Sequence, residues 1–340
     1  MDTPPTLFEL SDPEILVEIK KIPSITALFS KVVFLSIIRP DTLDDGTHVS
    51  KVKIVFNGVK PDGQKIRRYK QVCGFTSSAE TNDPDPDTCI PASYLQTLFI
   101  GLLGKFITTP HFPINPMGLI QVGQSFEQKR AVKTDEILDL SCQLQGMTKT
   151  VKGIHTRFYL AVSSDKEVVW QGISTFFTRS KHKQEKKVLE KKEEQLLDIK
   201  ERIFVPGNTG RKYAGVSGDY NPHHLYGITA KMIGFKHPIA HGMWSLARVM
   251  ASMEKNHGSR YPLRADAAFK LPIFMPATIT LGYAPSQKTV EENEPIEIRT
   301  TEIGTDKIKP EETRIDFELR DDQKGIPHLK GQFSCALENG

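Results

Sequence analysis

Two apolar helical segments, each followed by a run of strands, constrain the fold of this chain more than any other feature. Residues 91–107 are apolar on most sides, which predicts a buried central helix, and alternating segments within residues 119–180 then predict strands. In the second half, apolar residues recur at helical spacing from Met243 to Met253 and predict a second buried helix, again before strands that include residues 295–303. The repeated order predicts an α+β fold, antiparallel and internally duplicated.

A run of mixed charge over residues 181–202 separates the two halves. Its neighbouring Glu and Lys residues favour a solvated connector, and its acidic residues argue against a nucleic-acid-binding arm. We therefore expect an N-terminal domain over residues 1–180, a linker over 181–202 and a C-terminal domain over 203–340. Within the first half we expect a surface arm over residues 1–25, then strands over residues 32–40, 49–59 and 65–75.

Side chains that could act in acid–base catalysis gather between residues 213 and 253, where proline and glycine residues interrupt the chain. Asn221 is a good helix N-cap, and Pro222 suits the first helical position because its missing N–H costs nothing there. Gly234 can end that short helix in a left-handed conformation. A second helix that begins near Gly242 would point unpaired N–H groups and a positive dipole end at a polarised carbonyl oxygen or an oxyanion.

Asp219 and His224 lie five residues apart and bracket the predicted cap. A turn between them would let both side chains face one cleft. A carboxylate and an imidazole around one water molecule can act as general acid and general base. The pair therefore predicts a proton-transfer site.

The string SGDYNPHH…GFKHPIAHG resembles the signature of the MaoC-like, or hydratase 2, family of (R)-specific enoyl thioester hydratases. That signature reads S-G-D-x-N-P-x-H, then G-F, then P-I-x-H-G. The resemblance implies a double hotdog fold, in which two antiparallel sheets each wrap around a central helix. It also implies that Asp219 and His224 are catalytic and that the Gly242 N–H binds the thioester carbonyl. His223 departs from the signature, which usually has Leu or Ile there, and we expect it in the pocket wall or turned outward.

The same resemblance implies an activity, namely the interconversion of trans-2-enoyl-CoA and (3R)-3-hydroxyacyl-CoA in fatty acid metabolism, with no metal and no redox cofactor. The partner would be an acyl-CoA or an acyl carrier protein thioester. The loop before the first central helix has acidic residues but no histidine. We therefore expect one active site per chain, with the N-terminal half lining the acyl pocket. A carrier-protein dehydratase of fatty acid or polyketide synthesis and a non-catalytic acyl-thioester-binding protein are the alternatives.

Six residues near the pair are candidates for substrate binding: Gly242, Asn221, Ser217, Tyr213, Phe235 and His241. Packing is an alternative role for the aromatic residues among them, and His241 could also fix the start of the second helix. Ser217 is a poor nucleophile candidate because no G-x-S-x-G elbow surrounds it. A metal site that includes His237 and His241 is disfavoured, because Pro238 interrupts a helix between them.

Composition adds limits on partners and location. Hydrophobic residues make up 38% and charged residues 25% of the chain, as in ordinary globular proteins. The net charge of +4 does not argue for a nucleic-acid partner but allows a basic patch for the phosphates of coenzyme A. Four cysteines without a CxxC pair indicate a reducing compartment, and the acidic N-terminus is no secretory signal. We expect a cytoplasmic protein without a membrane span, with peroxisome and mitochondrion left open, and either a lone pseudo-dimer or a homodimer.

Overall fold

The computed structural model describes residues 5–75, 88–180, 197–232, 234–286 and 312–337. None of the helices in these ranges is both long and apolar enough to cross a bilayer. Along the chain the elements are β1 (Thr6–Phe8), β2 (Leu10–Glu18), α1 (Ile25–Ile38), β3 (Val49–Val59), α2 (Gly63–Cys73), α3 (Ala92–Thr97), α4 (Ile100–Ile107), η2 (Pro116–Gly118), β4 (Ile120–Gln128), β5 (Leu138–Thr150), β6 (Gly153–Ser164), β7 (Glu167–Arg179), β8 (Ile199–Val205), α5 (Thr209–Ser217), η3 (Pro222–His224), α6 (Gly227–Met232), α7 (Gly242–His257), β9 (Leu263–Phe269), β10 (Ala277–Pro285), β11 (Glu312–Asp321) and β12 (Pro327–Ala336).

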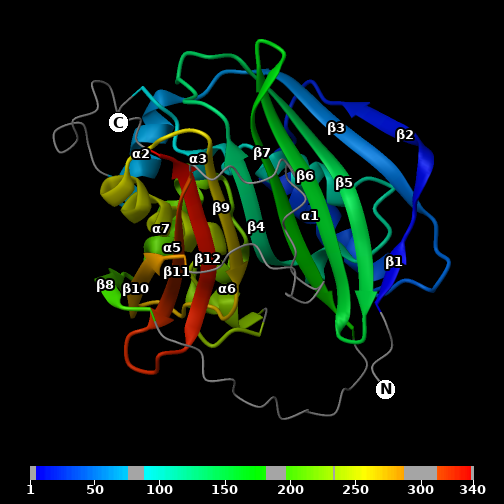
Figure 1. The fold of residues 1–340 in the computed structure, drawn as a ribbon. Coiled ribbons are helices and arrows are strands. Elements are labelled where there is room, and N and C mark those ends of the chain that lie inside the picture. The colour runs from blue at the N-terminus through cyan, green and yellow to red at the C-terminus, as the bar shows by residue number, and fades with distance from the viewer. Residues whose placement is uncertain (1–4, 76–87, 181–196, 233, 287–311, 338–340) are drawn as a thin grey trace.

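The strands form one continuous sheet in the order β2-β3-β5-β6-β7-β4-β9-β12-β11-β10-β8, and β1 pairs with β5 outside this path (Figure 1). When β1 and β2 are left aside, each half has five strands, and in both halves the strand that comes first in the chain is followed across the sheet by the third, the fourth, the fifth and then the second. The order is β3-β5-β6-β7-β4 in the N-terminal half and β8-β10-β11-β12-β9 in the C-terminal half. This matching order confirms the predicted duplication and the double hotdog fold. The two sheets join edge to edge through β4 and β9, which pair antiparallel.

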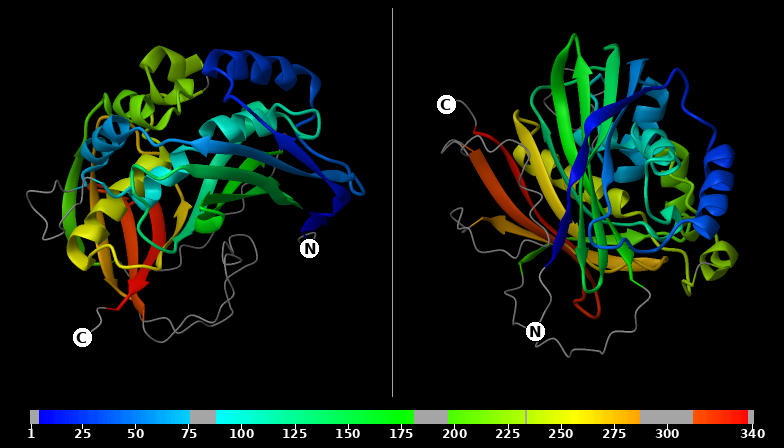
Figure 2. Two further views of the ribbon diagram at one scale, coloured as in Figure 1. Left: turned by 90° about the horizontal axis from the view of Figure 1, so that it is seen from above. Right: turned by 90° about the vertical axis from the view of Figure 1, so that its right-hand side faces the viewer.

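Each half buries its predicted central helix against the concave side of its strands, as the two views of Figure 2 show. In the first half the helix is divided into α3 and α4, and it buries Leu95, Phe99, Leu102 and Phe106. In the second half α7 begins at Gly242, as expected, and buries its apolar stripe completely. Burial of these large side chains, each worth about 1.5–3 kcal/mol, is the main force that holds each sheet around its helix.

Polar contacts tie the two halves together where β4 meets β9. The Arg264 side chain of β9 lies 2.8 Å from a carboxylate oxygen of Glu127 on β4 and 2.5 Å from one of Glu312 on β11. On the helical side of the sheet, Trp244 of α7 donates from Nε1 to the Val72 carbonyl of α2, over 3.1 Å. The C-terminal central helix is therefore fixed in part by the N-terminal half.

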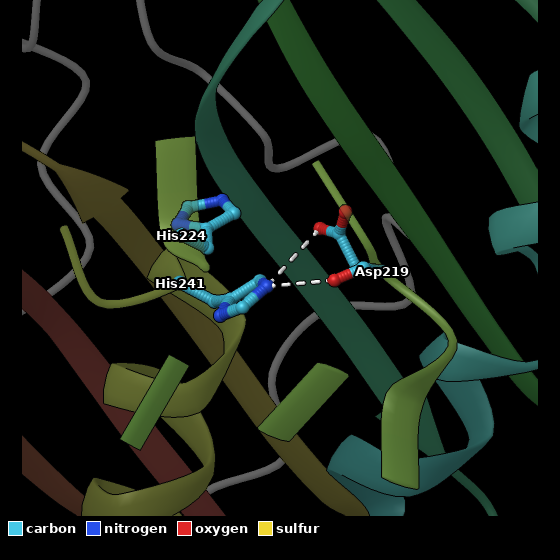
Figure 3. A group of neighbouring side chains, drawn as sticks. All are labelled: Asp219, His224 and His241. Atoms are coloured by element: carbon cyan, nitrogen blue, oxygen red, sulfur yellow. Dashed lines mark hydrogen bonds and ion pairs between the residues drawn. The ribbon is translucent and has the colours of Figure 1, made fainter. Parts of the chain in front are cut away.

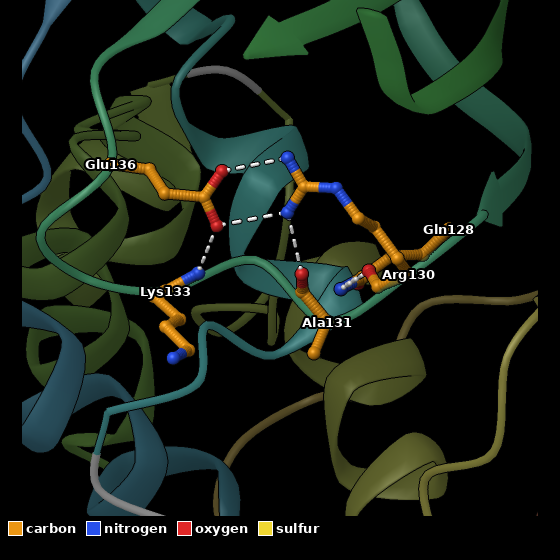
Figure 4. Close-up of polar contacts among 5 residues, drawn as sticks. All are labelled: Gln128, Arg130, Ala131, Lys133 and Glu136. Atoms are coloured by element: carbon orange, nitrogen blue, oxygen red, sulfur yellow. Dashed lines mark hydrogen bonds and ion pairs between the residues drawn. The ribbon is translucent and has the colours of Figure 1, made fainter. Parts of the chain in front are cut away.

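The loop between β4 and β5 is held by a bidentate ion pair (Figure 4). The two terminal nitrogens of Arg130 lie 2.9 and 2.8 Å from the carboxylate oxygens of Glu136, and the Lys133 N–H donates to Glu136 Oε1 over 2.7 Å. The Arg130 guanidinium is the main reason that the pKa of Glu136 falls to about 2. The Ile90 N–H, just before α3, donates to the Val132 carbonyl of this loop, so the ion pair also supports the start of the first central helix.

Three expectations for the first half were wrong. Residues 32–40, expected as a strand, mostly belong to helix α1, because an apolar run of this length suits either element and packing decides between them. Residues 65–75 form most of α2, whose N-cap Asp62 accepts from the Gln64 and Lys65 N–H groups. The arm expected over residues 1–25 is not simple in its described part, since β1 pairs with β5 and β2 pairs in parallel with β3.

The strands expected over 49–59 and within 119–180 are confirmed as β3 and β4–β7. The linker expected over 181–202 falls outside the described residues up to 196, and its last residues already belong to β8. The strand expected over 295–303 also lies outside the described residues.

Candidate active site

Asp219 is placed by the way helix α5 ends. Gly218 takes a left-handed conformation with φ of 88°, and its N–H donates to the Ala214 carbonyl over 2.8 Å. The Asp219 N–H then donates to Ser217 Oγ over 3.1 Å, and Asp219 Oδ1 accepts from the Asn221 N–H over 3.2 Å. These bonds fix the turn and hold the carboxylate, which remains partly open to solvent.

His224 is placed by the short helix η3, which Pro222 begins. Asn221 is its N-cap by position, but the Asn221 side chain is exposed and makes no capping hydrogen bond, so the expected capping role was wrong. The reason is that a three-residue 3₁₀ turn closes through the backbone, where the His224 N–H donates to the Asn221 carbonyl over 3.0 Å. Gly234 has the expected left-handed conformation, but the helix before it is divided into η3 and α6.

The tautomer of His224 follows from its surroundings. Its Nδ1 lies 2.8 Å from the Ile239 carbonyl oxygen, which can only accept, so Nδ1 carries the hydrogen and Nε2 keeps a lone pair. The ring is buried, with 7% of its surface exposed. Burial lowers the pKa of His224 well below its ordinary value, and the neighbouring His241 acts in the same direction. The imidazole is therefore neutral at neutral pH and can accept a proton at Nε2.

His241 lies against both members of the pair (Figure 3). Its ring stacks on that of His224, with the centroids 3.6 Å apart, and its Nε2 lies 2.9 Å from the Asp219 carbonyl oxygen and 3.9 Å from Asp219 Oδ2. Because the carbonyl accepts, Nε2 carries the hydrogen. Burial lowers the pKa of His241 to about 3, so the ring stays neutral. The neutral His241 ring thus hydrogen-bonds to the backbone of Asp219 and stacks on the ring of His224, which fixes the orientation of that ring.

Side-chain nitrogen and oxygen atoms of Asp219, His224 and His241 lie close together. One ligand-type atom each from Asp219, His224 and His241 lies within 4.8 Å of the other two. A spacing of this size lets one water molecule touch both the carboxylate and the imidazole. The structure therefore brings the predicted pair together at one point, between α5 and the start of α7.

The same three residues deserve a test as metal ligands. His237, which the sequence suggested as a fourth candidate, is not part of the cluster and lines a surface cleft instead. His224 uses Nδ1 and His241 uses Nε2 to donate to backbone carbonyls, and the two rings are stacked at 24°. In-plane lone pairs of stacked rings do not converge on one point, as a tetrahedral site requires. The geometry suits proton transfer better than metal binding.

The other candidates fall into two groups. Ser217, Tyr213 and His241 are almost completely buried, and Tyr213 packs on His241 with ring centroids 4.9 Å apart. Gly242 and Phe235 are partly buried. Gly242 is the first residue of α7, and a Cβ added there would lie 3.0 Å from the Phe269 ring.

His223, the departure from the family signature, is partly buried. Its ring centroid lies 4.0 Å from that of His224 and 5.6 Å from that of Phe235. Phe235 in turn lines an open cleft together with Lys231, Gly234, Lys236 and His237. The cleft is thus connected to the pair through the adjoining rings of His223 and Phe235. Its two lysines belong to no motif, so no sequence pattern predicted it.

The N-terminal half also reaches the site. Tyr69 of α2 lies 5.9 Å from Tyr213, measured between ring centroids, and its hydroxyl donates to Ser93 Oγ of α3 over 3.1 Å. Only the pairing of the two halves in space brings these residues together, so no sequence pattern could have identified them.

Comparisons with known proteins agree with this site. Residues 179–306 match the family model described as the MaoC like domain. The chain is 28% identical to the 3-hydroxyacyl-thioester dehydratase X of Mycobacterium tuberculosis over 199 residues, which are 57% of this chain and 70% of that protein.

Solved structures show the same fold. The crystal structure of HtdX from Mycobacterium tuberculosis has a TM-score of 0.63 at 22% identity and covers 84% of this chain and 100% of its own. A MaoC-like dehydratase from Phytophthora capsici has a TM-score of 0.59 at 18% identity, with 85% and 96% covered. The peroxisomal multifunctional enzyme type 2 of Drosophila melanogaster has a TM-score of 0.60 at 16% identity, with 93% and 53% covered. The chain therefore has a duplicated hotdog fold and carries, around the Asp–His site, a MaoC-like dehydratase domain that is similar to a 3-hydroxyacyl-thioester dehydratase.

Proposed function

We propose that this protein interconverts trans-2-enoyl-CoA and (3R)-3-hydroxyacyl-CoA, with Asp219 and His224 as its catalytic residues. The observation that carries the proposal is the approach of the Asp219 carboxylate to the neutral, Nδ1-protonated ring of His224, within 4.8 Å. The relative from Mycobacterium tuberculosis, which is named a 3-hydroxyacyl-thioester dehydratase, supports an acyl thioester as the substrate.

The reaction consumes one water molecule and leaves the protonation of Asp219 and His224 unchanged over the full cycle. Water between the two side chains gives its proton to one of them as its oxygen bonds to C3 and the C2–C3 double bond opens. A proton then passes from the pair to C2, which restores the resting state. His224 Nε2 has the lone pair, and Asp219 the carboxylate oxygens, that such a water molecule would contact. General acid–base catalysis of this kind is typically worth about 10²–10⁴ in rate.

The start of α7 supplies the second feature of the proposed mechanism, a hydrogen-bond donor. It stabilises the negative charge that develops on the thioester oxygen. The first N–H groups of a helix have no intrahelical partner and lie at its positive end. Gly242 places one of them next to His241, and a Cβ at this position would be in tight contact with the Phe269 ring, 3.0 Å away. In acyl-transfer enzymes, which also stabilise an oxyanion, a donor of this type contributes about 3–4 kcal/mol to the transition state.

The two halves would have different roles. The domain over residues 203–340 supplies Asp219, His224 and Gly242. The domain over 1–180 supports the site through Tyr69 and would line the acyl pocket. Lys231 and Lys236 of the cleft offer positive charge for the phosphates of coenzyme A or of a phosphopantetheine carrier.

Product analysis tests the proposal. Purified protein is incubated with crotonyl-CoA and with longer trans-2-enoyl-CoA thioesters, and the 3-hydroxyacyl products are resolved by chirality. Formation of the (3R) product is expected, and formation of the (3S) product or no turnover would contradict the proposal. Parallel assays with the acyl carrier protein thioesters distinguish a carrier-protein dehydratase, and thioester binding without turnover would indicate a binding protein.

A further inference from the structure

Helix α1 presents an apolar face to solvent. Five large hydrophobic side chains on this helix are exposed, with Ile37 at 78%, Phe34 and Ile38 at 61%, Phe29 at 43% and Val33 at 38%. Their spacing places them on one broad arc of the helix. We call these five residues the α1 face. A contiguous exposed patch of this kind usually marks a binding surface.

The α1 face cannot be explained by a poorly docked helix, because the opposite side of α1 is firmly held. The Leu28 side chain packs so closely on α4 that a Cβ added to Gly104 would lie 2.8 Å from it. The Arg39 guanidinium donates to the Ile107 and Thr109 carbonyls over 2.8 and 2.5 Å. Leu35 on the inner side is buried. The helix is therefore apolar on both sides, and such a helix is normally covered on both.

The charged residues of α1 and of the segment that leads into it are positive, and the nearest acidic residues along the chain are Glu18 and Asp41, outside residues 19–40. Residues 19–40 contain Lys20, Lys21, Lys31 and Arg39 but no acidic residue, and the three lysines are exposed. Both panels of Figure 2 show α1 (blue) at the outside of the molecule, with α6 (yellow-green), which carries Lys231, next to it. An apolar helix face bordered by lysines matches the surface of an anionic membrane.

Length decides how α1 would meet a bilayer. A helix of 14 residues is about 21 Å long, which is less than the hydrocarbon core of about 30 Å, so α1 would lie in the interface. Protein–protein interfaces are depleted in lysine, which makes a second protein a poorer match than lipid. We propose that the α1 face binds reversibly to membranes that contain anionic lipids. This property goes beyond the proposed reaction and does not depend on it.

Flotation with lipid vesicles tests the inference. The wild-type protein is expected to float with phosphatidylcholine vesicles that contain phosphatidylserine, more weakly with phosphatidylcholine alone, and less as salt increases. The double variant Phe34→Ser/Ile37→Ser is expected to lower the partition coefficient about tenfold or more, since each exposed side chain loses most of its apolar area. The matched control is Ile199→Ser/Phe204→Ser on β8, whose residues are 65% and 66% exposed, and it should bind like wild type.

A charge-reversal variant, Lys20→Glu/Lys21→Glu/Lys31→Glu, should also weaken binding to the anionic vesicles by roughly tenfold or more. Circular dichroism and hydration of crotonyl-CoA report on folding and on the active site separately. Absence of flotation, equal flotation with neutral vesicles, or unchanged flotation of Phe34→Ser/Ile37→Ser would each overturn the inference. A solution dimer that dissociates in Phe34→Ser/Ile37→Ser and never floats would assign the α1 face to a second copy instead, and would also overturn it.

Discussion

The imidazole rings of His224 and His241 lie with their centroids 3.6 Å apart and their planes 24° from parallel. The same His241 donates from Nε2 to the Asp219 carbonyl over 2.9 Å. One buried ring therefore contacts both of the proposed catalytic residues, which is the arrangement expected of a positioning residue.

Replacement of His241 by Phe keeps a ring against His224 but removes the donor to Asp219. Because the backbone turn that carries the Asp219 carboxylate then loses this hydrogen bond, we expect kcat for crotonyl-CoA hydration to fall about tenfold to a hundredfold, with a smaller change in KM. His241→Gln keeps a donor of similar reach and should recover part of kcat. A folded His241→Phe variant with wild-type kcat would contradict the positioning role.

The lowered pKa of His224 predicts the pH dependence of activity. A histidine base with an ordinary pKa of about 6.5 would be protonated, and inactive, as the pH falls through that value. Since burial lowers the pKa of His224, the unprotonated base persists to lower pH. We expect kcat/KM to stay level from neutral pH to below 6.5 and to fall only in more acidic solution, with folding followed by circular dichroism. A midpoint at or above about 6.5 would show that His224 is not the titrating base.

The cleft beside Phe235 predicts where charge affects substrate binding. The variant Lys231→Glu/Lys236→Glu should raise KM for crotonyl-CoA by about tenfold and leave kcat nearly unchanged, because the phosphates are remote from the reacting carbons. The KM for a pantetheine thioester, which lacks the nucleotide phosphates, should be the same in this variant and in the wild type. Lys152→Glu/Lys166→Glu, at exposed turns of the N-terminal half, is the matched control. Equal KM values for both variants would argue against phosphate binding in this cleft.

The Arg130–Glu136 pair predicts an acid-sensitive contribution to stability. Arg130 holds the pKa of Glu136 at about 2, below that of an unfolded chain, so the folded state binds fewer protons. The contribution is present above about pH 4.5 and is lost as the pH falls towards 2. Arg130 is 43% exposed, which screens the pair, and we expect Glu136→Gln to lower the free energy of unfolding by about 1–2 kcal/mol at neutral pH.

Denaturant unfolding at several pH values measures this effect. The difference between Glu136→Gln and wild type should shrink as the solution becomes more acidic. Asp45→Asn removes a comparable contact to Lys149, but Asp45 is 72% exposed, so its effect should stay within about 0.5 kcal/mol at every pH. A Glu136 effect that did not vary with pH would rule out the ion pair as its origin.

The sequence predicted those parts of the fold whose local and long-range signals agree. The segments that became α4 and α7 are apolar with a helical period, and the strands β4–β7 alternate, so burial and local preference favour the same element. In α1 the two disagree, because Val32, Val33, Ile37 and Ile38 favour strands locally while the packing of Leu28 on α4 requires a helix. For α2 a signal was present: Ile66, Tyr69, Lys70 and Cys73 recur at helical spacing after the cap residue Asp62, and all four are buried.

The site was predictable where its residues share one short stretch of chain. Asp219, His224 and Gly242 could be singled out from the spacing of residues in that stretch and from its resemblance to the MaoC-like signature. The stacking of His241 on His224, the contact of Tyr69 with Tyr213 and the Trp244 bond to Val72 depend on how distant segments fold against each other. No local pattern contains that information.

The rate of hydration by the Asp219→Asn variant tests the central claim most directly, because this change keeps the size of the side chain and removes only its charge. With circular dichroism and thermal unfolding like those of wild type, we predict that kcat/KM for crotonyl-CoA falls by about 10² or more. A folded Asp219→Asn protein that hydrates crotonyl-CoA at a near wild-type rate would contradict the assignment of Asp219 and His224 as the proton-transfer pair.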